Sequence, residues 1–310
     1  MRKKIDDLDL RLISLLEEQG RETTVLLARQ LGCSRHKVMN RMKSLTKNGV
    51  ILSYMTLINF RVLSEGFYAM VSLQVDPIKI RQVVQEILKI DEFYMVYSIM
   101  GEYDVEAVGF FENKDHFERI VVDNVSRVEG VKKTYSEIYL KSYHWGHDCF
   151  PPSLKHEPRK SPGKDFDATD LRLAKLLITN GRASFKWIAR QLGLTIQSVS
   201  SRIARLTKKG IISGYYVVAD YSLLGFSTQA LIRLGIDPPK FESVLDKVLQ
   251  LKPQWADELI GAYDLLLYVN MKDHEELRKL IRDQLSHIDG VQKIDSYFIT
   301  RFYQKKSEDM

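Results

Sequence analysis

Two segments of the chain concentrate polar and basic side chains at spacings that place them on one face of a helix. The first set is Ser34, Arg35, His36, Lys37, Asn40 and Arg41, and the second set is Thr195, Gln197, Ser198, Ser201, Arg202 and Arg205. Arginine, asparagine, glutamine and serine pair with the base edges of double-stranded DNA, and lysine and arginine also bind its phosphates. A solvated helix face is the alternative for each residue taken singly. At Arg41 and Arg202, which are equivalent, an ion pair within the chain is an equal alternative.

Both segments belong to a tandem duplication. Residues 9–54 align without a gap with residues 170–215, and roughly 20 of about 46 positions are identical. The alignment continues at a near-constant offset as far as Gly130-Val131 and Gly290-Val291. A whole two-part module has therefore been copied, and we expect the chain to act with two heads.

Each copy begins with three predicted helices. In the first copy, leucines at helical spacing from Leu8 to Leu16 predict a helix that Gly20 ends, and a second helix runs to Gly32. Ser34 is a natural N-cap for the third helix, and Thr195 takes this role in the second copy. A glycine turn followed by a capped helix with a polar face predicts a helix-turn-helix, whose last helix enters the DNA major groove. If both last helices read DNA, their different surface residues predict different half-sites.

The second part of each copy reads strand, helix, strand, strand, helix, strand. These elements occupy residues 67–140 and 227–302, and an alternating strand at 50–57 or 211–218 links them to the helices. The order predicts a ferredoxin-like sandwich, one sheet with two helices on one face.

The open face of each predicted sheet needs a cover. In the first copy it carries Tyr68, Met70, Tyr94 and Val96, which are apolar or aromatic. We therefore expect the two sheets to pack on each other, which makes the single chain an intrachain pseudo-dimer.

The predicted fold class is α+β, with two (winged) helix-turn-helix domains and two ferredoxin-like βαββαβ domains in one chain. The expected boundaries are 1–60 and 61–142 for the first copy, 143–166 for a linker, and 167–221 and 222–310 for the second copy. Four prolines predict that the linker is extended.

The positive charge of the chain is concentrated in the duplicated helices. The formal net charge is +6. Residues 1–50 hold about 11 Lys and Arg against 6 Asp and Glu, and residues 165–214 hold about 9 against 3, so the remainder is net negative. A basic surface repeated in both copies favours a polyanionic partner.

Other partners and compartments are disfavoured. No apolar run approaches the ~20 residues that span a bilayer, and the N-terminus lacks a signal-peptide core, so we expect a cytoplasmic protein without a membrane partner. The 2 cysteines fall in unrelated contexts. His144, His147 and Cys149 of the linker lack a nearby fourth ligand, so we predict neither a metal site nor a cofactor.

The joint order of these motifs resembles the Lrp/AsnC (feast/famine) transcription regulators over nearly the whole chain, twice. The motifs are D…L…L…G-R…A-x-x-L-G-S, then R-x-x-x-L-x-x-x-G-[VI]-I, then a βαββαβ domain with G-x-Y-D between its middle strands. In that family the ferredoxin-like part is the RAM domain, which drives oligomerisation and often binds an amino acid or similar small effector where subunits meet. Family members normally carry one module, so the two modules here put the usual homo-octamer in doubt, although further homo-oligomerisation is compatible with the resemblance.

The resemblance implies an effector site only at the matching positions, which are Gly101, Tyr103, Asp104, Gly261, Tyr263 and Asp264. Glycine lets backbone N–H groups approach a carboxylate, and aspartate can hold an α-ammonium group. The alternative is a tight turn between strands, with tyrosine as packing and aspartate as a turn acceptor.

The predicted function is a sequence-specific, non-catalytic DNA-binding transcription regulator that acts as a pseudo-dimer. The alternative is an Lrp-like tetrapyrrole (sirohaem) decarboxylase, a function known for some tandem or paired relatives, which would need histidines and arginines around an apolar cavity. His36 lies on a reading helix, and His116, His274 and His287 are expected at exposed helix positions. A third interpretation is that only one head binds DNA.

Overall fold

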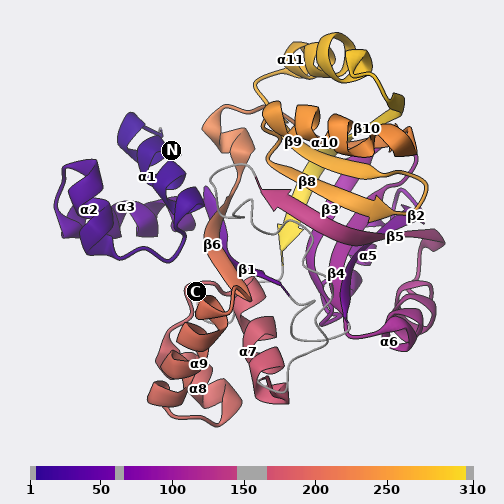
Figure 1. The fold of residues 1–310 in the computed structure, drawn as a ribbon. Coiled ribbons are helices and arrows are strands. Elements are labelled where there is room, and N and C mark those ends of the chain that lie inside the picture. The colour runs from indigo at the N-terminus through magenta and orange to yellow at the C-terminus, as the bar shows by residue number, and fades with distance from the viewer. Residues whose placement is uncertain (1–4, 60–65, 145–165, 305–310) are drawn as a thin grey trace. The chain divides into compact units, whose positions relative to one another are not determined.

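The computed structural model describes residues 5–59, 66–144 and 166–304, and these form two compact units (Figure 1). The first unit combines residues 5–59 with 166–224, and the second combines 66–144 with 225–304. Each unit therefore takes one part from each copy of the module. The predicted linker lies almost wholly outside the described residues, as do His147, Cys149 and the side chain of His144. Among the described helices, none is long and apolar enough to cross a membrane.

The first unit contains two sets of three helices. They are α1 (Asp7–Glu18), α2 (Thr24–Leu31) and α3 (Arg35–Lys47), and their counterparts α7 (Ala168–Thr179), α8 (Phe185–Leu192) and α9 (Ile196–Lys208). The leucines at helical spacing pack inward, since Leu12, Leu16 and Leu27 are fully buried. Gly32 and Gly193 adopt left-handed φ values of 64° and 67° in the turn before the third helix, a conformation that favours glycine.

Gly20 has a role that differs from the expected helix stop. Helix α1 ends at Glu18 with Gln19 as its C-cap, and Gly20 is not among the residues with positive φ. Its N–H donates to the carbonyl of Tyr215 at 2.7 Å, and an added Cβ would lie 2.7 Å from the backbone of Tyr216. Gly181 makes the same approach in the other copy, with its N–H 2.7 Å from the carbonyl of Tyr54. Glycine is needed here because two backbones touch.

The touching backbones belong to the strands that follow the third helices. Strand β1 (Ile51–Ile58) pairs antiparallel with β6 (Ile212–Ala219) in a two-stranded sheet. Helix α1 packs on β6 and α7 packs on β1, so each set of helices is completed by the strand of the other copy. Figure 1 shows the two sets of helices on either side of this pair. Within the described part of the chain, neither strand forms a wing in its own domain. The sequence predicted a strand that links the two parts of one copy, and its pairing with the strand of the other copy is an additional finding.

Two equivalent arginines each donate hydrogen bonds to backbone carbonyls of the other copy. Arg21 donates from Nη1 to the carbonyl of Gly181 at 2.6 Å and from Nη2 to that of Ala183 at 3.0 Å. Arg182 donates in the same way to Gly20 at 2.9 Å and to Glu22 at 3.0 Å. Burial lowers the pKa of both arginines, but each keeps a carbonyl partner at both Nη atoms.

The second unit contains two βαββαβ domains. The first domain has β2 (Phe67–Val75), α5 (Ile80–Ile87), β3 (Phe93–Met100), β4 (Val105–Phe111), α6 (Lys114–Arg119), a π-helical continuation (Ile120–Val125) and β5 (Val131–His144). The second has β7 (Thr228–Ile236), α10 (Phe241–Gln250), β8 (Trp255–Ile260), β9 (Leu265–Met271), α11 (His274–Lys279), another π-helical continuation (Leu280–Gln284) and β10 (Val291–Gln304). Short 3-10 turns lie at Pro238–Lys240 and Leu285–His287 in this unit, and at Tyr221–Leu224 at the end of the first unit.

The two sheets close into one barrel with the strand order β10-β3-β4-β2-β5-β8-β9-β7. Strand β5 pairs with β2 through residues 131–139 and then with β8 through residues 138–144. Strand β10 does the same, pairing with β7 through residues 291–298 and with β3 through residues 298–304. The expected packing of sheet on sheet within the chain is therefore confirmed, and it includes backbone pairing at both seams.

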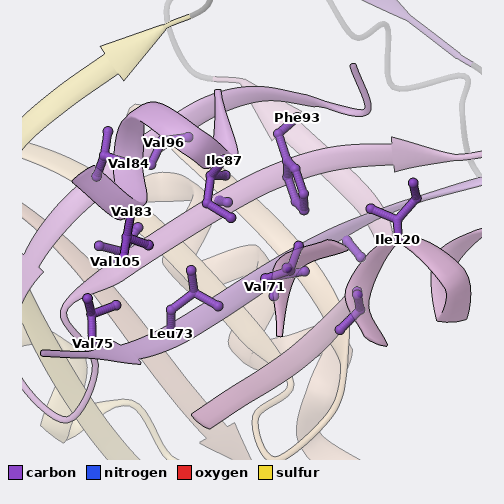
Figure 2. Packing of buried hydrophobic residues seen from close by; sticks show 14 of the residues in the cluster. Val71, Leu73, Val75, Val83, Val84, Ile87, Phe93, Val96, Val105 and Ile120 are labelled. Carbon is purple, nitrogen blue, oxygen red and sulfur yellow. The ribbon is translucent and has the colours of Figure 1, made fainter. Parts of the chain in front are cut away.

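Helices cover the outer face of each sheet. Figure 2 shows Val71 and Leu73 of β2 packed with Val83 and Ile87 of α5. Val96 also belongs to this cluster, so its expected place on the sheet-to-sheet face was wrong. Strand β3 has a register irregularity between Phe93 and Met95, which interrupts the simple alternation on which that expectation depended.

We expect Gly20→Ala to destabilise the first unit by about 1–3 kcal/mol, because the added methyl group would force β6 away from α1. Hydrogen exchange of the β1 and β6 amides would measure the effect. Gly193→Ala is the matched control: it has a strained φ but no atom within 4 Å of its Cβ, so it should leave exchange in β1 and β6 unchanged. Unchanged exchange in Gly20→Ala would contradict the close approach.

Candidate nucleic-acid interface and ligand loops

Helix α3 presents a polar and basic face. Arg35, His36, Lys37 and Asn40 are exposed, while Val38 on the opposite side is 1% exposed. Ser34 caps the helix by accepting a hydrogen bond at Oγ from the backbone N–H of Lys37 at 3.2 Å. The helix therefore starts at a fixed residue, with its charged first turn turned to solvent.

Two contacts orient the side chains of this first turn. Arg35 Nε donates to Thr24 Oγ1 at 3.1 Å, which ties it to the start of α2. Among the described residues its Nη1 and Nη2 atoms have no partner. A nitrogen–nitrogen contact of 3.2 Å joins His36 Nδ1 and Asn40 Nδ2.

Helix α9 is arranged in the same way with different chemistry. Thr195 Oγ1 accepts from the N–H of Ser198 at 3.1 Å as N-cap. Gln197 and Ser201 are exposed. Ile196, at the position of Arg35, is 52% exposed, and we did not predict it as a site residue. The sequence feature that could have identified Ile196 is an apolar residue at the first position of a capped, otherwise polar helix.

The remaining arginines of both helices lie in ion pairs. Arg41 Nη1 lies 2.6 Å from Asp6 and 2.8 Å from Asp9. The corresponding Arg202 lies 2.9 Å from Asp167 and 2.7 Å from Asp170, and Arg205 lies 2.5 Å from Asp170. The structure thus gives these arginines carboxylate partners on the first helix. Contacts of the same arginines with phosphate stay a prediction.

These ion pairs favour the ionised form of the carboxylates that cap α1 and α7. The hydrogen bond from Arg41 lowers the pKa of Asp6, and that from Arg202 lowers the pKa of Asp167. Asp9 and Asp170 are 3% and 0% exposed. Helices α3 and α9 are therefore each held against the first helix of the same head by a buried carboxylate.

The two Gly-x-Tyr-Asp loops join strands within their domains. Asp104 Oδ2 accepts from the N–H of Val75 at 2.7 Å, and Asp264 Oδ2 accepts from the N–H of Ile236 at 2.7 Å. Tyr103 and Tyr263 are each 7% exposed. These contacts are those of turn acceptors and packing residues, which is the alternative that the sequence left open.

The same loops also lie where the two domains meet. A Cβ on Gly101 would collide with the ring of Tyr297, and one on Gly261 would lie 2.9 Å from Cγ of Glu137. Each glycine therefore faces the last strand of the other domain. The backbone N–H of Ala262 donates to Tyr135 Oη at 2.7 Å. Effector binding at these positions stays a proposal.

A buried charge cluster, which the sequence patterns did not indicate, lies inside the barrel. Arg233, 1% exposed, lies with Nη2 2.8 Å from Glu106 and with Nε 2.8 Å from Glu137, and both carboxylates are fully buried. Within the described residues, Arg233 Nη1, Glu106 Oε2 and Glu137 Oε1 have no hydrogen-bond partner. Burial raises the pKa of Glu137. The sequence feature that could have identified this cluster is the presence of charged residues at inward positions of alternating strands.

Asp257 of β8 is another buried acid in this unit. It is 8% exposed, and burial raises its pKa to about 7, although a hydrogen bond from Ser142 opposes the shift. Its neighbour in the strand pairing, Leu266, is also buried. Below about pH 7 the carboxyl group is therefore mainly neutral in the folded state.

Two family models match the chain, and each matches it twice. An AsnC-type helix-turn-helix domain matches residues 5–46 and 166–207. An Lrp/AsnC ligand binding domain matches residues 68–145 and 229–308. Together they cover both copies of the module.

Individual relatives match this chain over the length of one module. A helix-turn-helix (HTH)-type transcriptional regulator of Methanocaldococcus jannaschii is 32% identical over 148 residues, which are 46% of this chain and 97% of the relative. An uncharacterized HTH-type transcriptional regulator of Pyrococcus furiosus is 28% identical over 143 residues, again 46% of this chain and 97% of the relative. Each relative thus has the length of one module.

A solved structure resembles both modules together. The crystal structure of the siroheme decarboxylase NirDL has a TM-score of 0.61 and covers 98% of this chain and 94% of its own. The sequence identity is 14%, so this likeness shows a shared fold.

The ion pairs predict unequal effects of two equivalent substitutions. Arg41→Ala removes the arginine from buried Asp9 and should destabilise the first head by roughly 1–3 kcal/mol, whereas Arg202→Ala leaves Arg205 on Asp170 and should cost less. Hydrogen exchange in α1 and α7 reports the two heads separately. Arg11→Ala, an exposed position on α1, is the control. Equal losses would contradict the role assigned to Arg205.

The buried acid predicts a pH dependence. Since the folded pKa of Asp257 is about 7 and its ordinary value is 3.8, the unfolded state gives up its proton first as pH rises. The free energy of unfolding of the second unit should therefore fall by on the order of 4 kcal/mol between pH 4 and pH 8. Asp257→Asn should abolish this decrease. Hydrogen exchange of β8 against pH would measure it. The same pH dependence in both proteins would refute the assignment.

Proposed function

Since the chain belongs to the Lrp/AsnC family, whose two domain models each match it twice, we propose that it is a sequence-specific DNA-binding transcription regulator without catalytic activity. The observation that carries the proposal is the pairing of two reading helices in one compact unit. Helices α3 and α9 each begin with a capped, exposed first turn, and the β1–β6 pair joins their heads. A single chain thereby supplies the two heads that a dimer normally brings to a pair of half-sites.

The charge of the exposed surface supports a DNA partner. Lys43 and Lys47 extend the exposed basic residues of α3, and Lys208 and Lys209 do the same at the end of α9. Lysine at these positions would neutralise phosphates and release counterions, which makes binding dependent on salt. Exposed residues of the first turns, such as Arg35 and Gln197, would then contact base edges.

We also propose that an amino acid or similar small effector tunes the DNA affinity by binding at the Gly-x-Tyr-Asp loops. Support comes from the match to a ligand binding domain and from the position of both loops against the other domain. Calorimetry with the twenty common amino acids would detect such a ligand. Any effector must change DNA affinity by the same factor by which DNA changes effector affinity.

A sirohaem decarboxylase is the second candidate, favoured by the whole-chain fold likeness to NirDL. The described histidines give it little support. His116 pairs with Glu92 at 2.8 Å and His274 contacts Thr228 at 3.0 Å, while His36 lies on the reading helix. A Soret band that shifts when iron uroporphyrin is added would favour the enzyme, and an unchanged spectrum would count against it.

Selection of random duplexes by the purified chain tests the leading proposal. We expect a two-part site whose log affinity falls steeply against log salt, by about 0.9 for each phosphate contact. Arg35→Ala and Gln197→Ala should each relax specificity in one half-site only, by roughly 5- to 100-fold. Arg81→Ala, an exposed arginine on α5 of the other unit, should change neither affinity nor slope.

Binding that is weak and shows no sequence preference would contradict the proposal that the chain is a transcription regulator. Equal relaxation of both half-sites by one substitution would contradict the model of two separate reading helices. Loss of one half-site alone from the selected sequence would show that a single head binds.

A further inference from the structure

The two reading helices differ in chemistry at the residue that follows the N-cap. Arg35 occupies this position in α3 after Ser34, and Ile196 occupies it in α9 after Thr195. Both caps accept the same hydrogen bond from the backbone N–H three residues further on, so the first turns have the same geometry. The substitution therefore replaces a cation by a branched apolar side chain at one fixed place.

Ile196 is conspicuous for its exposure. It is 52% exposed in a first turn that is otherwise polar, beside exposed Thr195 and Gln197. Single apolar residues on a surface are common. This one lies at the start of a recognition helix, and the N-terminal residues of such a helix are those that contact base edges in the major groove.

The major groove offers only one apolar group, the 5-methyl group of thymine. An isoleucine held at the groove can pack on that methyl and exclude water from both. Gln197, the next residue, has an amide that pairs bidentately with N6 and N7 of adenine. The first turn of α9 is thus suited to A·T pairs.

Arg35 is suited to a different pair. Its Nε is held by Thr24 Oγ1, and within the described residues its two Nη atoms have no partner. A guanidinium presented in this way pairs with O6 and N7 of guanine, which is the commonest specific contact of arginine with DNA. The first turn of α3 is thus suited to a G·C pair.

We propose that the two heads read chemically different half-sites, with Ile196 as a specificity-determining residue that packs on a thymine methyl group. Arg35 reads guanine in the other half. This inference rests on the proposed function, because it requires both helices to enter the major groove. It follows that the operator is asymmetric and that the chain binds it in one orientation.

Replacement of thymine by deoxyuridine, which lacks only the 5-methyl group, tests this directly on the selected duplex. Deoxyuridine in the half-site of α9 should weaken binding about fourfold for each contacted methyl group, and deoxyuridine in the half-site of α3 should have no effect. Ile196→Ala should bind the thymine and deoxyuridine duplexes equally. Ile196→Arg, which copies Arg35, should shift the preference of that half-site towards guanine.

The possible failures are distinguishable. If no specific duplex is selected, the proposed function fails and this inference fails with it. If a specific duplex is selected but deoxyuridine has no effect, or has equal effects in both halves, the regulator stands and the role of Ile196 is overturned. Because Ile196 is half exposed, its variants should retain the hydrogen exchange of the α8 and α9 amides, which confirms that they are folded.

Discussion

Antiparallel pairing of β1 with β6 is the constraint on which the first unit depends. It joins segments that lie about 160 residues apart, and the helices of each head pack on the strand of the other. The pairing is fixed at both ends by the same device, a glycine that admits the partner backbone and an arginine that satisfies the partner's carbonyls. The first head has no complete core alone, since Val217 and Ala219 of β6 belong to the core of α1–α3, and α7 of the second head packs on β1. Helices α3 and α9 are therefore held in one unit by structure that the two copies share.

The second unit uses the same principle with longer strands. Strands β5 and β10 each leave their own sheet and pair with the sheet of the other copy, which removes the exposed edges at both seams. The interior of the barrel also contains a pair of aligned residues that differ between the two copies. Arg233 aligns with Ser72 of the first copy, and the two residues touch, with Nη2 3.3 Å from Oγ. In a symmetric homodimer two arginines would meet at this place, whereas one chain can pair arginine with serine.

The sequence was sufficient for the elements and their order, because the information was local and repeated. Leucine spacing, the N-caps Ser34 and Thr195 and the glycine turns each depend on a few neighbouring residues. Local sequence makes Gly20 resemble a helix stop, whereas the residue that requires glycine there, Tyr216, lies far away in the sequence. The same limit applied to Val96, whose face depends on a register irregularity, and to Arg233, whose partners come from the other copy. Among the candidate site residues, exposure of Arg35 or Gln197 followed from helix periodicity, but the ion pairs of Arg41 and Arg202 required the tertiary contact between helices.

The central claim is that one chain is a complete two-headed reader with a fixed spacing. The most direct measurement is footprinting of the chain, with its stoichiometry, on the selected duplex and on duplexes with about 5 or 10 base pairs inserted between the half-sites. A single chain should protect both half-sites, and either insertion should reduce affinity to that of one half-site, because the β1–β6 pair cannot stretch. Two chains on each duplex, or full affinity restored by the longer insertion, would contradict the account.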